Sequence, residues 1–164
     1  MTAVPPVSLV TDANRGIGLE TARQLAALGH VVLRCARRLE DVERAAVGLT
    51  GLPGAVVPRR LDVTKADDLR ALERSVDVEF GRLDVLGNNA AINYDTADRA
   101  VDVDLDEVRR TLETNLFGAW RMLQVFLPLL RRSTHPRVVN VSSESGSLPR
   151  MTGGTRRTAS RKRP

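Results

Sequence analysis

The sequence has a single cysteine and no long apolar run, and both absences narrow the classes of protein that it can encode. One cysteine, Cys35, cannot form a disulfide within the chain, and its place in an apolar segment favours an unreactive core thiol. No apolar stretch approaches the roughly 20 residues of a membrane-spanning helix, and the N-terminal residues lack the charged-then-apolar pattern of a secretion signal. We therefore expect a cytoplasmic protein without a membrane partner.

The C-terminal stretch 150–164 lacks acidic residues, and this absence explains the basic character of the chain. The formal net charge is +5 and the pI is about 10.5. Six of the 25 basic residues lie in this stretch, so the other 19 face 20 acidic residues in a nearly neutral body. We predict a basic, disordered tail at 150–164. Such a tail can bind nucleic acid, but it has no aromatic residue to stack on bases, so no nucleic-acid partner is expected.

Strand-like and helix-like segments alternate along the rest of the 164-residue chain. The expected strands are 7–11, 30–36, 55–61, 83–86 and 137–141, and the expected helices are 16–28, 39–47, a helix capped by Thr64 and ended by Gly81, and 105–131. Short loops between alternating strands and helices indicate parallel βαβ units. The predicted fold class is therefore α/β, a Rossmann-type doubly wound parallel sheet, which forms one domain over 1–149.

The helix expected at 105–131 carries an apolar stripe that predicts which of its faces is buried. The stripe consists of Val108, Leu112, Leu116, Ala119, Leu123, Leu127 and Leu130. We expect Pro128 to kink the end of this helix.

A glycine-containing loop lies between the first strand and the first helix, where such loops place backbone N–H groups against a diphosphate. Its candidate cofactor-binding residues are Thr11, Asn14, Arg15, Gly16, Ile17 and Gly18. Asp12 is the exception in this loop, because a carboxylate is a poor neighbour for a phosphate. A tight turn that binds no ligand is the alternative interpretation.

Arginines occupy the end of the second strand, where an acid would bind the adenosine ribose and favour NAD. The residues there are Ala36, Arg37 and Arg38. Because an arginine fork matches a phosphate, Arg37 and Arg15 favour NADP over NAD. The alternative is a solvated strand end, which is a serious possibility for Arg38.

Further polar motifs follow the later strands in order. They are Asp62-Val63, Asn88-Asn89-Ala90-Ala91, Asn115 in the long helix, and Ser142-Ser143-Glu144-Ser145-Gly146. Taken singly, Asp62 and Ser143 could be helix caps. Taken together from residue 7 to about 150, the five motifs resemble the classical short-chain dehydrogenase/reductase family.

The resemblance implies an NAD(P)-binding Rossmann domain, in this chain incomplete on its C-terminal side, and an oxidoreductase acting on a carbonyl or alcohol without a metal. It implies that Asp62 and Val63 contact the adenine, and that Asn89 and Ala90 lie along the adenosine ribose. Asn115 would support the water relay of the active site, and Ser143 would hydrogen-bond the substrate oxygen.

The family's catalytic tyrosine, with a lysine four residues later, is missing where it is expected, roughly a dozen residues after the serine. The single tyrosine, Tyr94, lies far upstream and is followed at that spacing by Asp98. A shifted reading frame after Gly154 can encode both residues at the family spacing, so we hypothesise a frameshift there. The same codons permit other residues, and the nucleotide sequence would decide.

The departures from the family pattern lead us to expect a truncated, inactive member. Asp12 and Ala91 stand where the family has glycine, and Gly87 stands where an apolar strand residue is expected. A non-catalytic dinucleotide-binding protein is the alternative. Helix 105–131 implies a homo-oligomer by the resemblance, but without the later helix that assembly is doubtful here, and an open sheet edge predicts poor solubility.

Overall fold

Five parallel strands form the centre of the protein. The computed structural model describes residues 4–44, 49–92 and 101–143. The strands are β1 (Val7–Val10), β2 (Val31–Ala36), β3 (Ala55–Arg60), β4 (Val85–Asn88) and β5 (Arg137–Asn140), in the order β3-β2-β1-β4-β5. Leu9 of β1 lies opposite Leu33 on one side and Leu86 on the other. The predicted parallel α/β sheet is confirmed, whereas the expected tail 150–164 and the domain limit before it lie outside the described residues.

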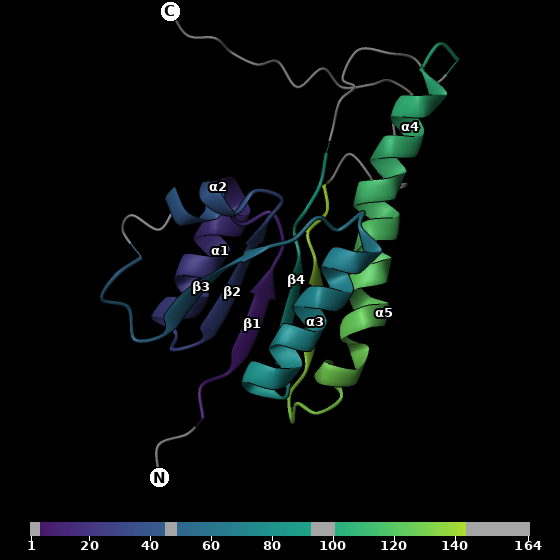
Figure 1. Cartoon of the computed structure of the whole chain (residues 1–164). Coiled ribbons are helices and arrows are strands. Elements are labelled where there is room, and N and C mark those ends of the chain that lie inside the picture. Colours follow the sequence, from purple (N-terminus) through teal and green to yellow (C-terminus); the bar gives the residue numbers. More distant parts are fainter. Residues whose placement is uncertain (1–3, 45–48, 93–100, 144–164) are drawn as a thin grey trace, which may run out of the picture.

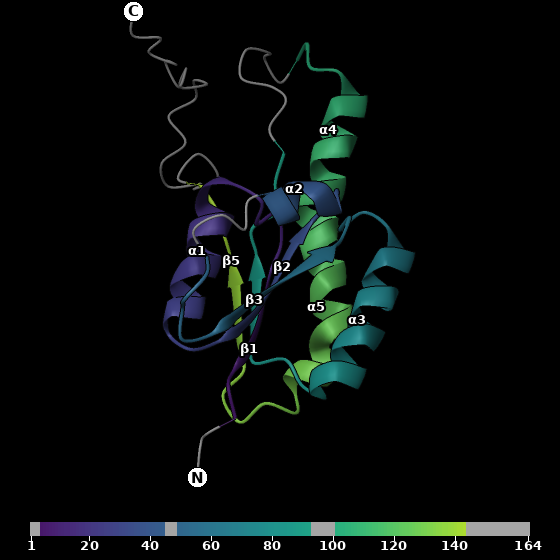
Figure 2. The same ribbon diagram turned by 60° about the vertical axis from the view of Figure 1, so that its left-hand side comes forward.

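Helices cover both faces of this sheet, as a doubly wound fold requires. They are α1 (Gly16–Ala27), α2 (Leu39–Arg44), α3 (Ala66–Phe80), and a continuous run of α4 (Leu105–Leu112), the π-helical η1 (Glu113–Gly118) and α5 (Ala119–Leu130). Figure 2 shows α1 on one face of the sheet and α3 with α5 on the other. No helix in the described part of the chain is long and apolar enough to cross a bilayer.

The two faces of the sheet have separate cores, which explains why consecutive residues of β1 and β2 are buried. Val10 and Val32 pack with Ala22 and Ala26 of α1. The neighbouring positions Leu9 and Leu33 point the other way and join the larger core with α3 and α5. Cys35 belongs to this larger core, and burial raises the pKa of its thiol to about 12, which supports the predicted unreactive thiol.

Two of the predicted boundaries are wrong by one or two residues, each for a local hydrogen-bonding reason. The fourth strand begins at Val85, not Leu83, because the Leu83 N–H donates to the Leu129 carbonyl of α5 at 3.2 Å. Thr64 does not cap α3, whose N-cap is Lys65. The Thr64 hydroxyl instead donates to Asp62 Oδ1 at 2.7 Å. Gly81 does end α3, as predicted.

The predicted apolar stripe of 105–131 is confirmed at Leu130 and wrong at several earlier positions, because the run is not a uniform α-helix. In α5 the buried side chains are Met122, Phe126, Leu129 and Leu130, whereas Leu116 and Leu123 of the predicted stripe are exposed. The π-helical turns of η1 hold more residues per turn than an α-helix, so the buried face rotates relative to a constant 3.6-residue pattern. Pro128 lies inside α5, close to its end.

Exposed apolar residues gather in two places. Leu112, Leu116, Phe117, Trp120 and Leu123 lie along α4, η1 and α5, and Val138, Val139 and Val141 lie on or next to β5. β5 pairs only with β4 and stands at one end of the described sheet (Figure 1). Both features support the predicted poor solubility, which stays a prediction.

The rotated face of α5 leads to a stability prediction. Phe126→Ala should lower the free energy of unfolding by about 3–5 kcal/mol, because it leaves a cavity in the larger core. Leu123→Ala, three residues earlier on the exposed side, should cost less than about 1 kcal/mol. Urea unfolding followed by circular dichroism measures both values, and equal losses for the two variants would contradict the assignment of the faces.

Candidate functional site

A pocket lies where the central strands end, at the edge of the sheet toward which all five strands run. Its empty space is about 460 Å³, part of it open to solvent. The lining residues come from the segments that follow β1, β2, β3 and β4 and from η1: Asp12, Arg15, Ala36, Arg37, Leu61, Asp62, Val63, Ala90, Ala91, Ile92 and Thr114. Ligands of doubly wound proteins bind at this edge of the sheet.

The loop after β1 leads directly into the N-terminus of α1. The helix begins at Gly16, and its N-cap Arg15 makes no side-chain hydrogen bond to the first turn. The first turn also contains no acidic residue. The free N–H groups and the positive end of the helix dipole therefore remain available to an anion.

Gly18 is required here by the close approach of backbone segments. A Cβ atom at this position would lie 2.5 Å from Asn89 Nδ2 and 2.7 Å from the Asp12 carbonyl oxygen. Only glycine lets α1 pack this closely against the loops after β1 and β4.

Thr11 and Asn89 join the loops after β1 and β4 through a set of buried and half-buried hydrogen bonds. Thr11 Oγ1 accepts from the backbone N–H groups of Asn89 at 2.9 Å and Ala90 at 2.8 Å. In return, Asn89 Nδ2 donates to the carbonyl oxygens of Thr11 at 2.9 Å and Asp12 at 3.1 Å. Both side chains therefore position the loops that line the pocket, and neither Thr11 nor Asn89 lines it.

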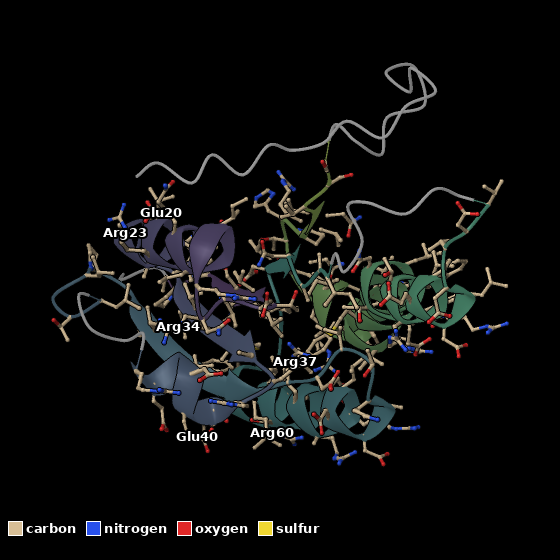
Figure 3. The ribbon with its side chains drawn as sticks, turned by 90° about the horizontal axis from the view of Figure 1, so that it is seen from above. Glu20, Arg23, Arg34, Arg37, Glu40 and Arg60 are labelled. Carbon is tan, nitrogen blue, oxygen red and sulfur yellow. The ribbon has the colours of Figure 1, made fainter. Side chains whose placement is uncertain are left out.

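The two arginines that follow β2 have different surroundings. Arg38 donates to Asp41 Oδ1 at 3.1 Å and does not line the pocket, in line with a solvated strand end. Arg37 lines the pocket, and no hydrogen bond or ion pair joins it to another described residue. Figure 3 looks onto this edge and shows Arg37 near its centre, whereas Glu20, Arg23 and Glu40 lie at the periphery.

Asp62 and Val63 form one wall of the pocket, after β3. The carboxylate of Asp62 accepts from the N–H of Thr64 at 2.9 Å and from its hydroxyl at 2.7 Å, so the side chain closes a local turn. Val63 is buried against η1, where a Cβ atom on Gly118 would lie 2.8 Å from Val63 Cγ2. The π-helical segment can approach the sheet because this position is a glycine.

Asn115 of η1 binds the backbone of the segment after β4 with both atoms of its amide. Oδ1 accepts from the Ile92 N–H and Nδ2 donates to the Ile92 carbonyl, each at 2.8 Å. The next residue toward the N-terminus, Thr114, lines the pocket. Single π-helical turns within α-helices occur frequently at functional sites.

The remaining predicted site residues lie around this pocket or outside it. Asn14, Gly16 and Ile17 belong to the loop and the first turn of α1 and do not line the pocket. Ser143 follows β5, is exposed, and is the last described residue. The stretch 144–164, which holds the motif residue Gly146 and Lys162, lies outside the described residues, as does Tyr94. Sequence reasoning missed Leu61, Ile92 and Thr114, although each adjoins a residue that the motifs marked.

The parallel sheet, the uncapped glycine-loop helix and the pocket at the strand ends define a Rossmann-type α/β fold. The model of the family described as short chain dehydrogenase matches residues 6–159. The chain therefore belongs to the short-chain dehydrogenase/reductase family.

Curated relatives and solved structures agree with this assignment. A putative ketoacyl reductase of the granaticin polyketide synthase of Streptomyces violaceoruber is 40% identical over 88% of this chain and 57% of that protein. The human protein named carbonyl reductase [NADPH] 3 is 38% identical over 87% of the chain and 50% of the relative. A metagenomic short-chain oxidoreductase in complex with NADP superposes with a TM-score of 0.78 at 28% identity, covering 87% of this chain and 64% of that one. The chain thus spans little more than half the length of the curated relatives.

The hydrogen bonds that join the loops after β1 and β4 give the first prediction about the site. Thr11→Val should lower the free energy of unfolding by about 1–3 kcal/mol, because two backbone N–H groups lose their acceptor. Thr21→Val, at an exposed position of α1, is the matched control and should stay within about 0.5 kcal/mol of the original. Thermal and urea unfolding measure both changes. An unchanged free energy of unfolding in Thr11→Val would show that the hydrogen bonds of Thr11 do not stabilise the fold.

Proposed function

We propose that this chain binds NADP(H) in the pocket at the strand ends, with the adenosine between Arg37 and the wall formed by Asp62 and Val63. Arg37 carries the proposal: it lines the pocket and has no partner among the described residues. A guanidinium in this position can form two parallel hydrogen bonds to a 2′-phosphate. The metagenomic relative in complex with NADP and the human carbonyl reductase [NADPH] 3 support the same cofactor.

The diphosphate of the cofactor fits the N-terminus of α1. The uncapped first turn supplies N–H donors, and Arg15 adds a positive charge at the rim of the pocket. Gly16, Ile17 and Gly18 would present backbone rather than side chain to the phosphates, with Asn14 beside them. Thr11, Asn89 and Ala90 contribute by fixing the two loops against each other.

The reaction that we infer for the family member is hydride transfer between the nicotinamide and a carbonyl or alcohol. The bound cofactor supplies the hydride, and Ser143 would donate a hydrogen bond to the substrate oxygen. Asn115 would act as a positioning residue, since its amide fixes the Ile92 backbone beside the pocket. We place this protein in the cytoplasm as part of the same proposal.

This polypeptide should nevertheless show negligible catalytic turnover of a carbonyl substrate. Reduction of a carbonyl needs a proton donor for the developing alkoxide, and no tyrosine follows Ser143 in the sequence. The expected result is cofactor binding without catalysis, the behaviour of a non-catalytic dinucleotide-binding protein. The assay follows NADPH absorbance with a panel of aldehydes and ketones, and oxidation that depends on the carbonyl and on intact Ser143 would contradict this expectation.

Two neighbouring arginines allow a matched test of the binding proposal. Arg37→Ala should weaken NADPH binding by about tenfold or more, because a charge-assisted pair of hydrogen bonds to the 2′-phosphate is lost. Arg38→Ala makes the same chemical change one residue away, outside the pocket, and should leave the dissociation constant within about twofold. Isothermal titration calorimetry measures both.

The NADPH proposal fails under either of two outcomes. The first is that the original chain does not bind NADPH at millimolar concentration. The second is that the two arginine variants weaken binding equally, which would indicate an effect of net charge rather than a contact of Arg37.

A further inference from the structure

Asp12 is an unusual residue on two independent grounds. Its backbone has a φ of 50°, and it is the one non-glycine residue with positive φ in the described part of the chain. Asp12 is also one of the residues that line the pocket. Asp and Asn adopt the left-handed conformation at lower cost than most residues, so the loop keeps its shape while placing an acid at the pocket.

The pocket wall contains two acidic and two basic residues. They are Asp12, Arg15, Arg37 and Asp62. Asp12 is the acidic residue whose carboxylate has no partner among the described residues. Asp62 is held by the backbone N–H and hydroxyl of Thr64. The carboxylate of Asp12 makes no hydrogen bond or ion pair within the described residues, and neither arginine is paired with it. Its acceptor oxygens are therefore available to a ligand.

A carboxylate and an arginine in one pocket select opposite forms of the adenosine ribose. In NAD the 2′-hydroxyl and 3′-hydroxyl are hydrogen-bond donors, and in Rossmann proteins an acid at the end of the second strand accepts from them. Here β2 ends at Ala36 and is followed by Arg37 and Arg38, so no acid stands there. Asp12 lines the same pocket from the loop after β1, so it can supply the carboxylate that the strand end lacks.

We propose that Asp12 is a specificity-determining residue, which accepts a hydrogen bond from the ribose hydroxyls of NAD(H) and repels the 2′-phosphate of NADP(H). The inference rests on the proposed function, because it requires the adenosine to bind in this pocket. Arg37 and Asp12 then both contact the adenosine ribose, so the chain binds both cofactors. Asp12 limits the preference for NADP(H) that Arg37 creates.

The test is whether Asp12→Asn shifts the affinities for NADPH and NADH in opposite directions, a crossover. This change removes the charge and keeps a side chain that tolerates positive φ. NADPH should bind about tenfold more tightly, because a like charge near the phosphate is gone. NADH should bind about threefold more weakly or worse, since a neutral amide oxygen is a poorer acceptor than a carboxylate. Calorimetric titration of the full chain with each reduced cofactor gives both constants.

Two further variants separate the charge of Asp12 from other effects. Asp67→Asn changes the net charge equally at an exposed position of α3, outside the pocket, and should leave both affinities within about twofold. Asp12→Gly removes the carboxylate and relaxes the backbone, and it should raise NADPH affinity while lowering NADH affinity, like Asp12→Asn.

Each outcome decides between the two proposals. Opposite shifts for NADPH and NADH in both Asp12 variants support the inference. Shifts in the same direction assign the effect to what both cofactors share, namely repulsion of the diphosphate or, in Asp12→Gly, backbone strain, and they overturn the inference, as do unchanged affinities. If neither cofactor binds to the original chain or to any variant, the proposed function fails and the inference fails with it, whereas binding without a crossover sinks the inference alone.

Discussion

The contact between the loops after β1 and β4 is the constraint on which the rest of the site depends. β1 and β4 are neighbours in the sheet, and Thr11 and Asn89 connect the segments that leave them. Gly18 allows α1 to pack against the same junction. Because these contacts use Thr11, Asn89 and backbone groups, and at position 12 only the carbonyl oxygen, the geometry tolerates side-chain changes at the rim, including an acid at position 12.

The opposite wall of the pocket depends on a second close approach, between η1 and the segment after β3. Gly118 permits contact with Val63, and Asn115 fixes the backbone at Ile92. The π-helical turns bring Gly118 against Val63 and Asn115 against the Ile92 backbone, while the α5 turns that follow bury a different face, with Phe126 in the core. One local irregularity thus serves the pocket and decides which residues of α5 are buried.

Sequence patterns predicted the strands and the loop because those signals are local. A buried parallel strand is a short run of Val and Leu, and the loop after β1 is marked by Gly16 and Gly18. The stripe of the long helix was wrong at several positions because a constant period does not register a π-helical insertion. The burial of Arg34 in the middle of β2 carried no sequence signal either, and burial lowers the pKa of its guanidinium. The partners of Asn115 could not be foreseen, since they are backbone atoms distant in sequence.

Shape and charge are set by different parts of this pocket. Its walls are fixed by glycine contacts and by amide and hydroxyl groups that carry no net charge, namely Thr11, Asn89 and Asn115. Its charges come from side chains at the rim, and of these Asp12 and Arg37 have no fixed partner among the described residues. A substitution at the rim can therefore change the charge that the pocket presents to a ligand without disturbing the fold. This separation explains how a carboxylate can stand in the glycine-containing loop of a protein whose overall fold superposes on a solved short-chain oxidoreductase with a TM-score of 0.78.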